Sequence, residues 1–203
     1  FTAIVRANDA TAEVPGTSHF VVMDAEGDVV SMTTTVESFF GSGRVVHGFV
    51  LNNQLTDFSF VPTDKWGPAA NAVAPGKRPR SSMTPAIVLD AQGRFVAAVG
   101  SPGGNAILAY VGKTLVGLLA WEMSMQDAIN LPNLIARGTD FAAEVDKFPP
   151  AVVEGLRARG IELKSGRAEG SGLHGIMRAP DGRLTGGADP RREGVVLQAP
   201  PGP

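Results

Sequence analysis

The chain has 203 residues, of which 43% are hydrophobic and 19% are charged, and its formal net charge is -2. This balance is typical of a folded globular domain and excludes a disordered chain, and the scattered Lys and Arg residues exclude a basic nucleic-acid-binding stripe. The absence of cysteine excludes disulfides, thiolate catalysis and Cys-ligated zinc.

The first half of the chain is expected to consist of strands and loops. Residues 20–23 and 29–36 are β-prone runs, and the short Gly-containing loop 24–28 between them predicts a hairpin. A third β-prone run covers residues 45–51. Residues 60–79 are rich in Pro, Gly, Ala and Asn, which predicts a long surface loop of the kind that is often functional.

The second half begins with another hairpin pattern over residues 86–99. Apolar residues at helical spacing then predict a helix over residues 106–121. Ser124 with Asp127 three residues later is typical of the N-terminus of a second, shorter helix.

A third helix is expected over residues 150–159, where Gly160 ends it, and a last hairpin over residues 175–185. Hairpin-paired strands with helices inserted as blocks favour antiparallel sheets and an α+β fold.

Several common catalytic and nucleotide-binding motifs are absent from the sequence. It contains no phosphate-binding Gly-Lys-Ser/Thr and no His-Glu-x-x-His, and Gly41-Ser42-Gly43 lacks the third glycine of a dinucleotide site. His19, His47 and His174 are widely separated in β-like segments, so we expect them to pack in sheets rather than to act as ligands or acid–base groups.

Five sequence blocks instead carry the chemical signal. They are Thr17-Ser18-His19-Phe20 with the turn 24–28, residues 33–37 with 40–43, residues 51–54 with 57–59, residues 77–85, and Gly100-Ser101-Pro102-Gly103-Gly104. In this order the blocks resemble the small-subunit region of γ-glutamyltransferases, or γ-glutamyltranspeptidases, and the similarity runs from Thr17 to about Arg191.

The resemblance implies the αββα four-layer sandwich of N-terminal nucleophile hydrolases, an α+β fold with antiparallel sheets flanked by helices and completed by a large subunit. It divides the chain into an upstream linker or end of the large-subunit region (1–16), a catalytic region (17–192) and a C-terminal tail (193–203). A matured small subunit of this family begins at the nucleophile, so the upstream residues suggest an unprocessed or partly processed precursor, or the small-subunit half with its upstream linker.

By resemblance, Thr17 is the nucleophile and is released by autocatalytic cleavage of the Gly16–Thr17 bond. A hydroxyl is a poor nucleophile at neutral pH and needs a nearby base. A freed α-amino group, with a pKa of roughly 7.7–8.0, supplies that base from the same residue. While Gly16 remains attached, the Thr17 nitrogen is an amide and cannot act as a base.

Other positions match residues that support the reaction. Thr35 matches a threonine that hydrogen-bonds the nucleophile. Gly103 and Gly104 match the pair whose N–H groups form the oxyanion hole, just before the predicted helix. The remaining matches hold the γ-glutamyl group, where acidic groups suit its ammonium and hydroxyls suit its carboxylate; they are Glu37, Gln54, Asp57, Ser81 and Ser82.

The implied activity is that of a γ-glutamyltransferase and glutathione hydrolase, which forms a Thr17 acyl-enzyme from glutathione and related γ-glutamyl amides. A cephalosporin- or glutaryl-type acylase with the same machinery stays open, because Glu37 occupies a position where such acylases also carry Glu. An unprocessed, catalytically silent family member is the third reading.

The resemblance implies no metal or organic cofactor. The expected partners are a large subunit from the same precursor, in a heterodimer or a dimer of heterodimers, and a small-molecule γ-glutamyl substrate; nucleic acid is not expected. No apolar run approaches the roughly 20 residues of a membrane span. Family members imply a periplasmic or secreted location, and a cytoplasmic one remains open.

Overall fold

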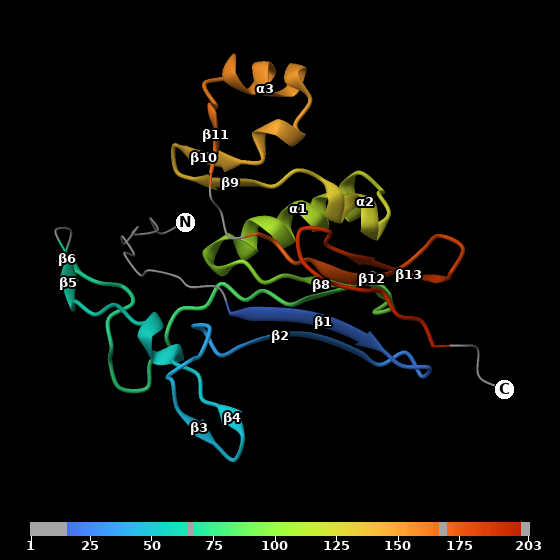
Figure 1. Cartoon of the computed structure of the whole chain (residues 1–203). Helices are drawn as coiled ribbons and strands as arrows, with labels where there is room; N and C mark the ends of the chain where they lie inside the picture. The colour runs from blue at the N-terminus through green and yellow to red at the C-terminus, as the bar shows by residue number, and fades with distance from the viewer. Residues whose placement is uncertain (1–15, 65–66, 167–169, 200–203) are drawn as a thin grey trace. The chain divides into compact units, whose positions relative to one another are not determined.

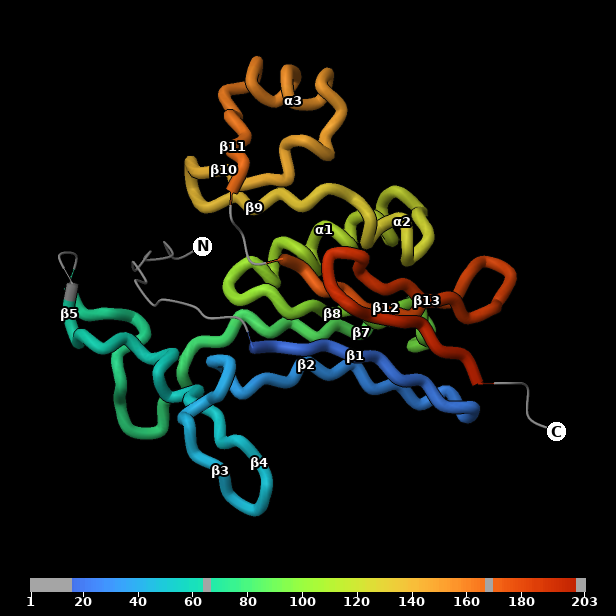
Figure 2. The backbone as a smooth tube through the Cα atoms, in the orientation of Figure 1, coloured from blue at the N-terminus to red at the C-terminus, as the bar shows by residue number. Residues whose placement is uncertain are grey.

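The computed structural model describes residues 16–64, 67–166 and 170–199, which belong to two compact units. Of these residues, Gly16 and the stretch from Thr35 to Ser82 belong to unit 1, and the others belong to unit 2. Figure 2 traces the backbone of the chain.

The centre of unit 2 is a four-stranded antiparallel sheet with the strand order β13-β12-β8-β7. Its strands are β7 (Ala86–Leu89), β8 (Phe95–Gly100), β12 (His174–Arg178) and β13 (Leu184–Ala188). Val99 of β8 pairs with Ala86 on one side and with Gly175 on the other. The second half of β8 is buried, so this strand forms the middle of the core.

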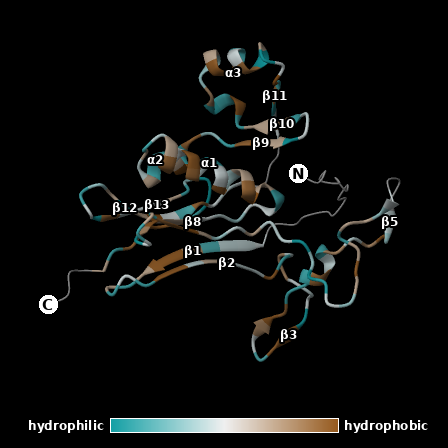
Figure 3. Cartoon of the chain, turned by 180° about the vertical axis from the view of Figure 1, so that it is seen from behind, coloured by the Kyte–Doolittle hydropathy of each residue, from teal (hydrophilic) through white to brown (hydrophobic). Residues whose placement is uncertain are grey.

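Helices α1 (Ile107–Ala120) and α2 (Met125–Asn130) cover one face of this sheet, as Figure 1 shows. Their inward residues join those of β8 in one hydrophobic cluster, which includes Val99, Ile107, Tyr110, Met125, Ile129 and Leu173. Small residues allow close packing, because a Cβ atom added to Gly175 would lie 2.6 Å from the Met125 sulfur. Figure 3 shows hydrophobic residues concentrated in α1 and α2 and in the second half of β1.

Strands β1 (Thr17–Met23) and β2 (Val29–Thr35) pair as a hairpin, and β1 contacts β8 and β12 on the face opposite the helices (Figure 1). Unit 2 therefore contains a helix layer, a four-stranded sheet and a two-stranded sheet. This is the mixed, antiparallel α+β layering that the sequence predicts.

A third sheet of unit 2 has the order β11-β10-β9 and was not predicted. Its strands are β9 (Leu134–Arg137), β10 (Asp140–Ala143) and β11 (Leu163–Ser165). β10 and β11 are parallel, and the connection between them contains η3 (Val145–Lys147) and α3 (Pro150–Arg157).

Unit 1 is built mainly from turns and short elements. They are β3 (Val45–Val46), β4 (Phe49–Val50), the 3-10 helix η1 (Gln54–Asp57), β5 (Thr63–Asp64) and β6 (Gly67–Pro68). The single strand expected over residues 45–51 is wrong. His47 and Gly48 have φ angles of 48° and 83°, so the run reverses into the β3–β4 hairpin.

The local helix signals are confirmed. Ser124 caps α2 by accepting a hydrogen bond from the Asp127 N–H, and α3 ends before Gly160, which has a φ of 78°. The described residues of the expected loop 60–79 are irregular apart from the short strands β5 and β6. In the described part of the chain, no helix has both the length and the apolar character needed to cross a membrane.

Candidate active site

Thr17 is the half-buried first residue of β1. Because side chains alternate between the two faces of a strand, Thr17 shares a face with the buried His19, whereas Ser18 and Phe20 are exposed. β1 contacts β8 and β12. Thr17 is therefore the first residue on the face of β1 that is covered by the central sheet.

Gly103 and Gly104 follow β8 and lead through η2 (Gly104–Ala106) into α1. Their φ angles are 134° and 52°, and a Cβ atom on Gly103 would lie 2.6 Å from the Tyr110 ring, so only glycine fits there without strain. N–H groups at a helix N-terminus lack acceptors within the helix and lie at the positive end of its dipole. Such a pair of glycine amides can stabilise a developing oxyanion.

A buried hydrogen-bond chain supports this glycine segment. The Ser101 hydroxyl donates to the Pro102 carbonyl oxygen at 2.6 Å and accepts from the Gly172 N–H at 3.2 Å. Next to Gly172, the Ser171 hydroxyl donates to Asp189 Oδ2 at 2.5 Å. The conformation of this glycine segment thus depends on residues that come late in the chain.

Asp189 belongs to a cluster of charged residues that the sequence analysis did not single out. The Arg191 guanidinium binds Asp189 Oδ1 at 3.1 Å and Glu144 Oε2 at 2.7 Å. Burial opposes ionisation of Glu144, but hydrogen bonds from Arg191 and Lys147 lower its pKa to about 2. Hydrogen bonds and opposite charges likewise raise the pKa of the buried Arg191. Glu144 and Arg191 are therefore both ionised at neutral pH.

Thr35, the last residue of β2, is tied to the residue before the predicted nucleophile. Its hydroxyl donates to the Gly16 carbonyl oxygen at 3.3 Å and accepts from the Glu37 N–H at 2.8 Å. A Cβ atom on Gly16 would lie 2.5 Å from the Glu37 carbonyl oxygen. A larger residue at position 16 would therefore disturb the close approach of Gly16 to the Glu37 backbone.

Glu37 has a φ of 72°, an uncommon conformation for a residue other than glycine. Its Oε2 accepts hydrogen bonds from the Ser38 hydroxyl at 2.8 Å and from Asn53 Nδ2 at 2.7 Å. Asn53 also accepts from the Ser38 N–H at 3.0 Å. The carboxylate is therefore held in a defined position by neutral donors, and Asn53 is a supporting residue that the sequence reasoning did not single out.

The other predicted substrate-binding residues lie further along unit 1. Gln54 and Asp57 are joined within η1 by a side-chain hydrogen bond, and Asp57 is buried. Ser81 is exposed and Ser82 is half-buried in the irregular segment before β7. All predicted substrate-binding residues thus belong to unit 1, whereas Thr17 and the glycine pair belong to unit 2.

The histidines only partly follow the expectation of sheet packing. His19 is buried in β1 and His174 is half-buried in β12. The assignment of His47 to a β segment is wrong, because it is an exposed residue of the β3–β4 turn. In residues 16–64, 67–166 and 170–199, no three His, Asp or Glu side chains are grouped as ligands for a metal ion.

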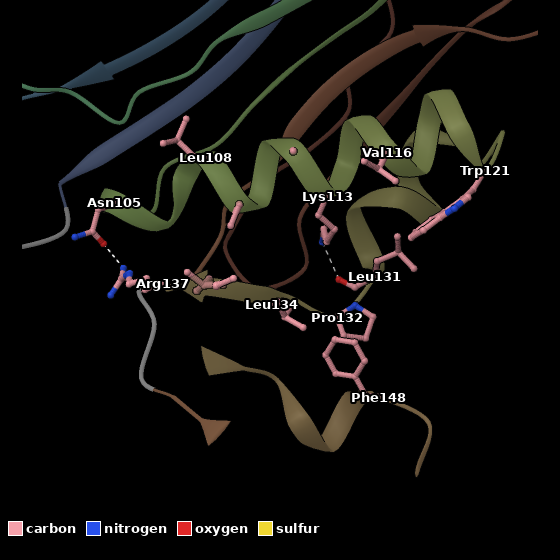
Figure 4. Close-up of a pocket in the computed structure, with 14 residues that line it drawn as sticks. Asn105, Leu108, Lys113, Val116, Trp121, Leu131, Pro132, Leu134, Arg137 and Phe148 are labelled. Atoms are coloured by element: carbon pink, nitrogen blue, oxygen red, sulfur yellow. Dashed lines mark hydrogen bonds between the residues drawn. The ribbon is translucent and has the colours of Figure 1, made fainter. Parts of the chain in front are cut away.

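A separate apolar groove of about 690 Å³ lies between α1 and the segment around β9 (Figure 4). Leu108, Val116 and Trp121 line the α1 side, and none of the predicted site residues lines the groove. Lys113 points across it and donates to the Leu131 carbonyl oxygen at 2.8 Å, and burial lowers the pKa of Lys113 to about 8. The groove is therefore distinct from the predicted catalytic residues.

Comparison with known proteins yields a consistent set of relatives. A family model described as Gamma-glutamyltranspeptidase matches residues 2–199. The glutathione hydrolase proenzyme of Escherichia coli (strain K12) is 37% identical over 183 residues, which cover 86% of this chain and 31% of that protein. The acylase ACY 1 proenzyme of Pseudomonas sp. (strain SE83) is 34% identical over 187 residues, which cover 91% of this chain and 32% of that protein.

A solved structure is similar over most of the chain. The γ-glutamyltranspeptidase from Pseudomonas nitroreducens complexed with L-DON has a TM-score of 0.73 and 29% identity, and the match covers 90% of this chain and 99% of that chain. The present chain thus corresponds to one whole chain of that structure, and it spans about a third of the length of the two proenzymes, 31% and 32%.

Proposed function

Because this chain belongs to the γ-glutamyltranspeptidase family, we propose that it carries the nucleophile of an enzyme that transfers and hydrolyses γ-glutamyl groups, with Thr17 as the attacking residue. The similarity to a γ-glutamyltranspeptidase chain over most of its length supports this assignment. The proposed partner is a large subunit released from the same precursor, which would complete a heterodimer.

The observation that carries the proposal is the hydrogen bond from the Thr35 hydroxyl to the Gly16 carbonyl oxygen, at 3.3 Å. A donor on this oxygen polarises the carbonyl group that must be attacked for the chain to be cut before Thr17. The Thr17 hydroxyl oxygen adds to the Gly16 carbonyl carbon, and the bond to the Thr17 nitrogen breaks. Water then hydrolyses the resulting ester, which leaves a Gly16 carboxylate and a free Thr17 amine.

The same hydroxyl then reacts with the substrate. The Thr17 amine accepts the hydroxyl proton while the oxygen attacks the γ-carbonyl carbon of a γ-glutamyl amide, and the proton passes to the departing amine. The Gly103 and Gly104 N–H groups stabilise the oxyanion of the tetrahedral intermediate. Attack by water on the ester releases glutamate, and attack by an acceptor amine forms a new γ-glutamyl amide.

Recognition of the glutamyl group is assigned to unit 1. The carboxylates of Glu37 and Asp57 suit its ammonium, with Gln54 beside them, and the hydroxyls of Ser81 and Ser82 suit its α-carboxylate. The network around Glu37 supports this role, because neutral donors orient the carboxylate without cancelling its charge. The proposed donor substrate is glutathione or a related γ-glutamyl amide.

Intact-mass measurement of the full-length protein tests the nucleophile. We expect the wild-type precursor to be cut into two chains. The chain that begins at Thr17 is expected to gain one covalent adduct after treatment with L-DON. Thr17→Ala is expected to remain uncut and unlabelled. Ser18→Ala, which removes an exposed neighbouring hydroxyl, is the matched control and is expected to behave like wild type. Labelling of Thr17→Ala at the wild-type rate would exclude Thr17.

A second candidate function is acylase activity on an N-acyl group that lacks the glutamyl ammonium. The similarity to the acylase ACY 1 proenzyme favours it as the alternative. Initial rates with γ-glutamyl-p-nitroanilide and glutaryl-p-nitroanilide separate the two, and faster turnover of the glutaryl compound would contradict the γ-glutamyl assignment. Absence of both cleavage and labelling in the wild-type protein would instead indicate a silent family member.

A further inference from the structure

His19 is a buried polar side chain on the same face of β1 as Thr17. Its exposed fraction is 5%, and it lies two residues after Thr17. Its Nδ1 is 2.9 Å from the Thr33 hydroxyl of β2. Its Nε2 is also buried and has no hydrogen-bond partner among the described residues. Burying a polar atom without a partner costs about 1–3 kcal/mol, so an aliphatic side chain would be the simpler way to fill this position.

The imidazole ring packs against the backbone at the end of β8. A Cβ atom on Gly100 would lie 2.3 Å from His19 Cε1 and 2.5 Å from Nδ1, so the ring occupies the space that a side chain at position 100 would take. Gly100 is the first residue of the segment that continues through Ser101 and Pro102 to Gly103, and these three residues are buried. One ring thus lies between the strand of Thr17 and the start of the glycine segment.

The surroundings of His19 keep the ring neutral. Burial, together with a smaller effect of the nearby His174, lowers its pKa to about 4. His174 comes from β12, where it pairs with Gly100, and its own Nδ1 is 3.0 Å from the Gly172 carbonyl oxygen. A neutral imidazole has one donor and one acceptor nitrogen, so it can bind the Thr33 hydroxyl without bringing a charge into the sheet.

We propose that His19 is a positioning residue, which holds the strand of Thr17 at a fixed spacing from the Gly100–Gly104 segment and so aligns the Thr17 hydroxyl with the glycine N–H groups. The inference rests on the proposed function of Thr17. The ring is flat and compact enough to lie against the glycine backbone, and the bond to Thr33 fixes its orientation. A displacement of about 1 Å between reacting groups can reduce a rate by 100-fold, so this spacing matters for chemistry more than for substrate affinity.

Two substitutions of similar size test the proposal in the full-length protein. His19→Asn retains a polar group that can bind the Thr33 hydroxyl, whereas His19→Leu keeps the volume and loses the hydrogen bond. We expect His19→Leu to lower kcat for γ-glutamyl-p-nitroanilide and the L-DON labelling rate by about 30- to 100-fold with KM changed less than about twofold. We expect His19→Asn to recover most of this loss.

Val21→Ala is the matched control, because Val21 lies on the same face of β1 two residues further along and is half-buried. It is expected to lower the melting temperature without lowering kcat by more than about twofold. Thr33→Val removes only the hydroxyl that binds Nδ1 and gives a second route to the answer if His19→Leu does not fold; we expect it to lower kcat with KM unchanged.

The outcomes separate this inference from the one on which it rests. If wild-type protein is not labelled at Thr17, the proposed function fails. If wild-type protein is labelled but His19→Leu and Thr33→Val react at the wild-type rate, His19 is a packing residue and the positioning role is wrong. Equal losses of kcat in His19→Asn, His19→Leu and Val21→Ala would likewise overturn it.

Discussion

Unit 1 and unit 2 hold their predicted site residues in place by different physical means. In unit 2 most of the buried hydrophobic residues form one cluster around β8, α1 and α2. Among the described residues of unit 1, only Phe58 and Ala69 are buried hydrophobic residues, and several large apolar side chains are exposed, including Phe40, Phe49, Leu55 and Phe60. The positions of Glu37 and Asp57 depend instead on hydrogen bonds to Ser38, Asn53, Gln54 and Asn71.

This difference matches the division of labour proposed above. A nucleophile and an oxyanion hole need groups fixed to within fractions of an ångström, which a packed core provides. A recognition surface built from loops can change its contacts at lower cost in stability. Substitutions in unit 2 should therefore affect stability and kcat, whereas substitutions of the substrate-binding residues in unit 1 should mainly affect KM and substrate choice.

The largest effect is expected for Asp189→Ala in unit 2. The change leaves the Arg191 guanidinium without one of its buried carboxylates and the Ser171 hydroxyl without its acceptor, so we expect a loss of about 3–5 kcal/mol in the free energy of unfolding. Urea denaturation followed by circular dichroism measures it. Asp181→Ala removes an exposed carboxylate that is paired with Arg183, and its melting temperature should stay at the wild-type value. Equal stability of the two variants would show that the buried cluster does not support unit 2.

The next effect concerns the rigidity of the glycine pair. Gly103→Ala forces a residue with a side chain into a φ of 134° and against the Tyr110 ring, which should displace an oxyanion donor and lower kcat by about 100- to 1000-fold. Gly112→Ala in α1 is the control, because its added Cβ meets no atom within 4 Å and alanine favours a helix. The measurement is the steady-state rate with γ-glutamyl-p-nitroanilide. A normal kcat in Gly103→Ala would show that this glycine pair does not stabilise the oxyanion.

Local features of the fold could be predicted from sequence, and contacts between distant segments could not. Some signals depend on only a few neighbouring residues and are therefore visible in the sequence. They include the apolar spacing of α1, the Ser124 cap and Gly160 at the end of α3. The sheet of β9, β10 and β11 was missed because β11 pairs with a strand that precedes a whole helix. The β3–β4 turn was missed because His47-Gly48 is not among the Asn-Gly or Asp-Gly pairs that announce such hairpins.

The same distinction applies to the candidate site. Thr17 and the glycine pair were found through the order of the family blocks, not through periodicity. The functional interest of His19 depends on its contact with Gly100, and no local pattern indicates that two strands meet there. Asn53 was overlooked because its importance comes from the hydrogen bond that it donates to Glu37.

A third prediction concerns pH and tests how tightly unit 2 is packed. The pKa of His19 is about 4 in the folded state and its ordinary value is 6.5, so between these pH values the unfolded state binds a proton that the folded state does not. The free energy of unfolding therefore falls as the pH falls from 6.5 toward 4, by about 2–3 kcal/mol between pH 6.5 and pH 4.5. Urea denaturation across this range measures the slope.

His19→Asn should flatten that slope, because asparagine does not titrate. The range from pH 6.5 to pH 4.5 also distinguishes the effect of His19 from that of Glu144. The pKa of Glu144 is lowered to about 2, and its contribution to the free energy of unfolding is lost only as the pH falls below its ordinary value of 4.5. An unchanged slope between pH 6.5 and pH 4.5 in His19→Asn would mean that His19 is accessible to water in unit 2.

The smallest effect is expected for Glu37→Gln in unit 1, and it is the sharpest test of the contrast between the units. The substitution keeps the size of the side chain and an oxygen acceptor for the Ser38 and Asn53 donors, but it removes the charge. We expect KM for γ-glutamyl-p-nitroanilide to rise about tenfold, which corresponds to ~1.4 kcal/mol, with little change in melting temperature.

Glutaryl-p-nitroanilide lacks the ammonium, so its KM should stay the same or fall in Glu37→Gln. Glu26→Gln removes an exposed carboxylate from the β1–β2 turn and controls for the loss of one negative charge. An equal rise of KM for both substrates would mean that Glu37 shapes the loop rather than binding the ammonium. A fall in kcat instead of a rise in KM would break the contrast itself, because it would show that a residue of the hydrogen-bonded unit 1 aligns the reacting groups as directly as the packed core of unit 2 does.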